Sequence, residues 1–125
     1  MKPTVLLLLL LAAVAAAAED PGRLWSEKVQ PFLAARCYEC HGEKKAKHKL
    51  RLDSKEGILK GGSELGPAVV PGKPEASPLV TVCGLPTGQE LAMPPKGERP
   101  TKEEIAVIRT WIAGGAVFDV PTPKK

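Results

Sequence analysis

The chain has 125 residues, of which 43% are hydrophobic and only 4% are aromatic. Its 18 basic and 14 acidic residues give a formal net charge of +4, too small a surplus to indicate a nucleic-acid-binding protein. A chain of this length is expected to form one small domain, and such domains often need a disulfide or a bound group for stability.

The N-terminus carries the pattern of an export signal. Lys2 precedes an unbroken apolar run from Val5 to Ala18, which ends in three alanines before Glu19. This pattern predicts a secretory signal peptide over residues 1–18, cleaved after Ala18. Because a bilayer span takes about 20 apolar residues, the run is short for a transmembrane helix, and an uncleaved anchor is the alternative. We therefore expect a secreted or periplasmic protein with one domain over residues 19–125.

The three cysteines are the most informative residues. An odd number cannot pair completely, so at least one has another role. Cys37 and Cys40 belong to the run Cys37-Tyr38-Glu39-Cys40-His41, a C-x-x-C-H pattern typical of covalent attachment of c-type haem. Residues three and four apart share one face of a helical turn, so both cysteines can reach one porphyrin while His41 points at the iron.

Other uses of the C-x-x-C pattern are open. A thioredoxin-like redox pair favours a βαβ setting, whereas residues 24–36 before the motif read as helical. A zinc site needs four ligands, which only His48 and Cys83 are placed to complete, without the usual paired spacing. A plain disulfide is the third alternative, and haem attachment is the favoured reading.

Met93 is the candidate for the second axial ligand of the haem iron. Met1 would leave with the signal peptide, so Met93 is the one methionine expected in the exported chain. Its thioether suits iron, and the following Pro94-Pro95 gives a stiff, extended segment that can hold the sulfur over one haem face. The competing ligand, His48, lies in a lysine-rich loop and is predicted to be a solvated surface histidine.

The remaining pattern predicts short helices separated by loops. The first helix lies within residues 24–36 and is expected to start properly near Pro31. A capping box at Thr101 to Glu104 opens the last helix, whose apolar stripe includes Trp111, and Gly114-Gly115 ends it. We expect Trp111 to pack in the core against the first helix.

Between these helices, residues 54–60 and 78–83 are helix candidates, the second with Ser77 as its N-cap. Residues 61–100 hold seven glycines and eight prolines and are expected to be mostly ordered loop. Cys83 is predicted to be a buried, small apolar residue.

The sequence resembles the planctomycete-type cytochrome c domain, a small class I-like haem module, over about residues 25–118. The matching segments, in chain order, are residues 29–37, 40–42, 50–54, 61–62, 66–74, 77–79, 93–95 and 111–116. The resemblance implies an all-α fold in which short helices and long Gly/Pro-rich loops wrap around one haem. It also implies that Cys37 and Cys40 carry the haem, with His41 as proximal and Met93 as distal ligand.

These observations predict an exported monohaem cytochrome c that transfers single electrons between redox partner proteins. We expect a monomer that is not an enzyme and binds neither nucleic acid nor, apart from an uncleaved signal anchor, a membrane. The lysines at 44, 45, 47 and 49, with Arg36 and Arg51, lie close to the haem motif and either attract an acidic redox partner or form a solvated loop. The alternative is an open-site haem protein, a peroxidase-like enzyme or a gas sensor, in which Met93 does not hold the iron. A zinc or thiol protein is the less favoured possibility.

Overall fold

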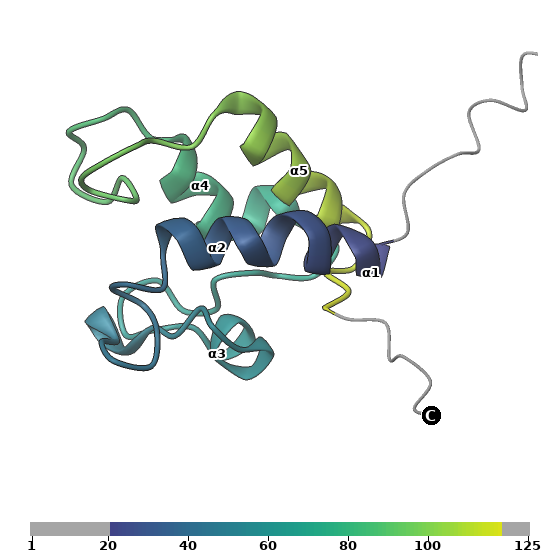
Figure 1. The fold of residues 1–125 in the computed structure, drawn as a ribbon, viewed down its shortest axis with the longest axis horizontal. Helices are drawn as coiled ribbons and strands as arrows, with labels where there is room; N and C mark the ends of the chain where they lie inside the picture. Colours follow the sequence, from purple (N-terminus) through teal and green to yellow (C-terminus); the bar gives the residue numbers. More distant parts are fainter. Residues whose placement is uncertain (1–20, 119–125) are drawn as a thin grey trace, which may run out of the picture.

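The computed structural model describes residues 21–118, and in this range the protein is all-helical (Figure 1). The helices are α1 (Pro21–Leu24), π-helix η2 (Trp25–Val29), α2 (Gln30–Arg36), α3 (Lys55–Lys60), α4 (Pro78–Gly84) and α5 (Lys102–Ala113), with short 3-10 turns η3 (Lys47–Lys49) and η4 (Pro74–Ala76). No strand occurs in the described residues, which confirms the predicted all-α class. The predicted signal peptide at 1–18 lies outside them. Within 21–118 no helix has the length and apolarity of a membrane span.

Helix α2 begins at Gln30 with Pro31 in its first turn, as predicted, but the chain before it is already helical. Elements α1, η2 and α2 follow one another without a break from Pro21 to Arg36. A proline inside a helix removes one N–H donor and crowds the preceding turn. Here the turn before Pro31 widens to π geometry, in which Gln30 donates its N–H to the carbonyl of Trp25. The widened turn lets the helix pass through the proline.

Helix α5 packs across this first segment and closes the core (Figure 1). Trp111 is fully buried and stacks on Trp25 with ring centroids 5.4 Å apart, and both rings meet the edge of Phe118. The indole Nε1 of Trp111 donates to the Val117 carbonyl at 2.7 Å. The prediction that Trp111 packs in the core against the first helix is confirmed.

The predicted N-cap residues of α4 and α5, Ser77 and Thr101, both occupy the N-cap positions, but only Thr101 makes a capping hydrogen bond with its side chain. Thr101 and Glu104 form the predicted capping box of α5. Ser54 caps α3 by accepting the N–H of Gly57 at 3.0 Å. Ser77, however, makes no capping bond to α4 with its side chain. Its fully buried hydroxyl instead accepts the N–H of Val70 and donates to the Lys73 carbonyl, which ties the loop before α4 to the helix.

Residues 61–100 are mostly loop, as predicted, with α4 as their longest helix. A tight turn at Gly61 to Gly66 lies near the start of this region, where Gly62 and Gly66 pair in an isolated β-bridge. Gly61 has φ +80°, and a Cβ atom there would overlap the carbonyl group of Gly66. Only glycine fits this turn, which borders the cavity described next.

Candidate functional site

The described residues enclose a cavity of about 230 Å³ between the end of α2, helix α4 and the loops at 62–68 and 90–94. A smaller cavity of about 90 Å³ adjoins the first one. The two cavities share several lining residues, including Met93. The apolar part of the wall of the larger cavity is formed by Phe32, Leu50, Ala68, Leu79, Val82 and Leu91. Such an apolar hollow suits a hydrophobic ligand.

Cys37, Cys40 and His41 enter the site on a single turn that continues from α2. The N–H of His41 donates to the Cys37 carbonyl at 2.9 Å, and that of Cys40 donates to the same carbonyl at 3.2 Å. Cys37 and His41 both line the larger cavity, and all three residues line the smaller one. The turn thus brings the three residues of the motif to one hollow, as the spacing predicts.

His41 is buried, with 8% of its surface exposed. Its Nδ1 atom is buried and has no hydrogen-bond partner among the described residues. Burial lowers the pKa of His41, although backbone groups of Leu50 and Lys47 oppose this shift. Burial thus favours the neutral imidazole, which is the form that binds metal ions.

The thiols of the site are unpaired in the structure. Burial raises the pKa of Cys37 to about 12, with the nearby Cys83 thiol adding to the effect and Arg36 opposing it. Within residues 21–118 no three His, Cys, Asp or Glu side chains gather as a metal site, so the zinc alternative gains no support there.

Met93 lies on the wall formed by the loop after α4 and contributes to both cavities. Its N–H donates to the Val82 carbonyl at 3.0 Å, which fixes the backbone of Met93 against the end of α4. The Met93–Pro94 peptide bond is cis. The structure thus brings Met93 to the same hollow as Cys37 and His41, which lie more than 50 residues earlier in the chain.

Two residues lie closer to the site than the sequence indicated. His48 is exposed, as predicted, and its Nδ1 lies 3.6 Å from a Glu64 carboxylate oxygen, yet it borders both cavities. Cys83 is buried, as predicted, but it faces the larger cavity. The helical spacing of Leu79 and Cys83, four residues apart, is the signal that would have placed Cys83 on the cavity side of α4.

Residues 37–97 match the family model described as Planctomycete cytochrome C. These residues belong to that family. No curated protein and no solved structure matches the chain. The match contains Cys37, Cys40, His41 and Met93, whereas α2 and α5 lie outside it. The family resemblance seen in the sequence is confirmed for this central segment.

Membership in the cytochrome c family implies a covalently bound haem c and a role as an electron carrier, typically without enzymatic activity. The residues of the cytochrome domain fit such a group. The hollow is largely apolar, two thiols and a neutral imidazole meet in it, and the buried His41 nitrogen has no partner within the described chain. Buried polar atoms are rarely left without a partner, so this donor set suits a metal-containing cofactor.

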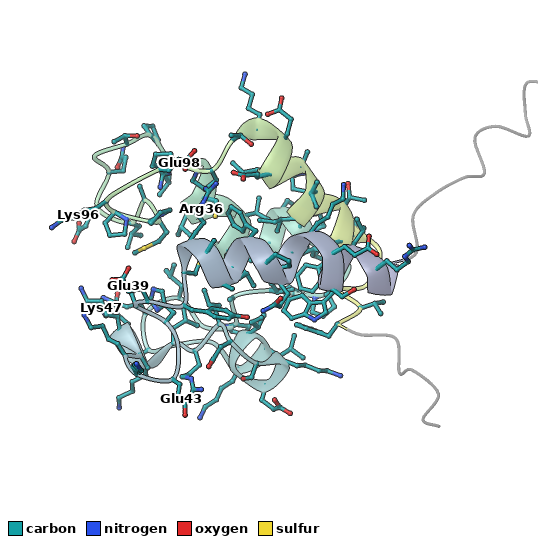
Figure 2. All side chains as sticks on the ribbon, in the orientation of Figure 1. Arg36, Glu39, Glu43, Lys47, Lys96 and Glu98 are labelled. Atoms are coloured by element: carbon teal, nitrogen blue, oxygen red, sulfur yellow. The ribbon has the colours of Figure 1, made fainter. Side chains whose placement is uncertain are left out.

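Charged side chains of both signs come from the loops after α2 and before α5 (Figure 2). Glu39 and Lys47 belong to the loop after α2, and Lys96 and Glu98 to the loop after Met93. Arg36, the last residue of α2, pairs with Glu104 of α5 at 2.9 Å and with Glu98 at 4.0 Å. Arg36 is thus engaged within the fold, whereas the lysines at 44, 45, 47 and 49 are exposed.

Proposed function

We propose that the protein is an exported monohaem c-type cytochrome that transfers single electrons between redox partner proteins. Cys37 and Cys40 carry the haem through thioether bonds, His41 is the proximal ligand and Met93 the distal ligand. One observation supports this proposal most strongly: Cys37, His41 and Met93, distant in the chain, line one apolar cavity.

The bound haem supplies the electron-transfer chemistry, and the chain holds it in place. The neutral His41 offers a nitrogen lone pair, and the backbone of Met93 is fixed by its hydrogen bond to Val82. Apolar side chains such as Leu79 and Val82 keep water away from the cofactor face. If His41 and Met93 both held the iron of a bound haem, no coordination position would be left for a substrate, so we propose an electron carrier rather than an enzyme.

We propose that the redox partner is a protein with an acidic docking surface. The exposed lysines beside the motif, Lys44, Lys45, Lys47 and Lys49, would attract such a surface over a distance of about one Debye length. Glu39 and Glu43 lie among them, so the attraction is moderate and the complex short-lived. Raising the salt concentration should slow electron transfer to an acidic partner and speed it to a basic one.

The decisive experiment is export in a host that attaches c-type haem, followed by a pyridine haemochrome assay and extraction with acidified acetone. One haem per chain that survives extraction is the expected result, and the double variant C37S/C40S should lose it. A colourless protein would refute the proposal and direct attention to the thiol and zinc alternatives.

The axial ligands are tested on the same protein. We expect M93A to retain attached haem but to show a lower reduction potential and to bind cyanide and carbon monoxide. A wild-type protein that already binds both ligands readily would favour the open-site haem protein instead. N-terminal sequencing of the exported protein tests cleavage after Ala18, and sedimentation tests the monomer.

A further inference from the structure

The side chain of Arg99 connects two parts of the cavity wall. It is half-buried in the loop between Met93 and α5. Its Nη1 donates to the Pro94 carbonyl at 3.0 Å. Its Nη2 lies 2.6 Å from the carbonyl oxygen of Leu85, 3.2 Å from that of Cys83 and 3.5 Å from that of Val82.

The three carbonyls reached by Nη2 belong to the end of α4. The last carbonyls of a helix have no partners within the helix, and the helix dipole makes this end negative. Helix α4 has no basic residue in its own last turn. Arg99 supplies from a distant position the positive charge and the donors that the helix end lacks, and the planar guanidinium can serve several carbonyls at once.

The carbonyl reached by Nη1 belongs to the residue directly after Met93. Met93 itself donates its N–H to Val82, at the same helix end. The backbone of Met93 is therefore attached to α4 on both sides, directly through Val82 and through Arg99 by way of Pro94. Val82 and Cys83 also line the larger cavity, so this attachment sets how the Met93 side chain approaches it.

We propose that Arg99 is a positioning residue that fixes the Met93 segment against the end of α4 and thereby keeps the methionine sulfur bound to the haem iron. This inference rests on the proposed role of Met93 as the distal ligand. Without Arg99, the hydrogen bond from Met93 to Val82 is the remaining bond among the described residues that joins the segment to the helix end. An external ligand can then displace the sulfur more easily.

The test compares R99M with wild-type holoprotein. R99M keeps the aliphatic length of the side chain but removes all donors. We expect haem to stay attached, the long-wavelength absorption band of methionine-ligated ferric haem to weaken, and the affinity for imidazole to rise about tenfold, equivalent to about 1.4 kcal/mol. R99K, which keeps the charge but not the planar fork, should fall between R99M and wild type.

A matched control separates positioning from general loss of stability. S77A removes the buried hydrogen bonds at the opposite end of α4 and touches neither Met93 nor Arg99. We expect S77A to lower the free energy of unfolding while leaving the absorption band and the imidazole affinity as in wild type. If S77A and R99M shift both quantities equally, or if R99M shifts neither, the role of Arg99 is purely structural and the inference is wrong.

The variant M93A distinguishes the two possible failures. If M93A keeps the wild-type band, Met93 is not the ligand and the proposed function fails at that point. If M93A loses the band while R99M keeps it, only the inference about Arg99 fails. Should R99M not accumulate with haem, R99Q takes its place, and wild-type imidazole affinity in R99Q overturns the inference.

Discussion

The buried hydroxyl of Ser77 gives the most direct test of the packing described above. Ser77 is 0% exposed and accepts the N–H of Val70 at 2.8 Å while donating to the Lys73 carbonyl at 2.9 Å. In S77A the methyl side chain fits, but the N–H of Val70 loses its acceptor. The Lys73 carbonyl belongs to an exposed residue and can turn to water.

The loss is therefore close to that of one unsatisfied, part-buried donor, about 2 kcal/mol. For a domain of this size, each kcal/mol lowers the melting temperature by about 4–8 °C, which predicts a decrease of roughly 8–16 °C. The measurement is urea and thermal unfolding of the haem-bearing protein, followed by absorbance and circular dichroism.

The matched control is S63A, which makes the same chemical change at an exposed position. The hydroxyl of Ser63 donates to the His48 carbonyl at 3.0 Å, but water can replace it, so the cost should stay within about 0.5 kcal/mol. If S77A destabilised the protein no more than S63A, the buried hydrogen bonds of Ser77 would not hold the loop before α4.

Three further predictions concern the ion pair, the turn and the third thiol. The half-buried ion pair Arg36–Glu104 should show a coupling free energy of about 1 kcal/mol in a double-mutant cycle with R36M and E104Q, measured by urea unfolding. A coupling free energy near zero would mean that this ion pair does not join α2 to α5. G61A should lower the free energy of unfolding by at least about 2 kcal/mol, because φ is +80° and the added Cβ atom meets the Gly66 carbonyl. At Gly88, where φ is +98° and the Cβ atom enters open space, G88A should cost only the backbone strain of about 1 kcal/mol. Equal losses of stability in the two variants would refute the steric argument. Burial raises the pKa of Cys83 to about 11 from 9.0, so the folded state retains its proton longer than the unfolded state, and stability should fall as the pH rises from 9 to 11. At pH 10 the holoprotein should lose on the order of 1 kcal/mol more than C83A does, and identical pH profiles for the two proteins would contradict the burial of this thiol.

Local signals in the sequence were enough to place several helix ends. The capping box at Thr101 and the glycines after Ala113 define α5 because every participating atom lies within a few residues in the chain. The motif from Cys37 to His41 was readable for the same reason. Met93 was identified by its chemistry and by the family resemblance, since no spacing rule relates it to His41.

The features that the sequence did not predict depend on contacts between distant segments. Ser77 occupies the N-cap position of α4, as predicted, but its hydroxyl accepts the N–H of Val70 in the preceding loop instead of an N–H of the helix. Pro31 lies in the first turn of α2, but the helical segment before it was not predicted, because a compensating π turn cannot be recognised from residue types. Arg99 donates to carbonyls at the end of α4, 14 to 17 residues earlier in the chain. Every residue has a backbone carbonyl, so no residue type in the sequence indicates which carbonyls Arg99 contacts.

The stacked pair of Trp25 and Trp111 has a practical consequence. These are the two tryptophans of the chain, and both lie where η2 meets α5, outside the lining of the haem cavity. Ultraviolet emission from the protein therefore reports on that helix contact, while visible absorption reports on the iron and its ligands. Haem accepts excitation energy from nearby indoles, so emission should brighten when the helices separate from the cofactor. During unfolding of one sample, visible absorption and fluorescence together show whether the iron ligands dissociate before or after the helices separate.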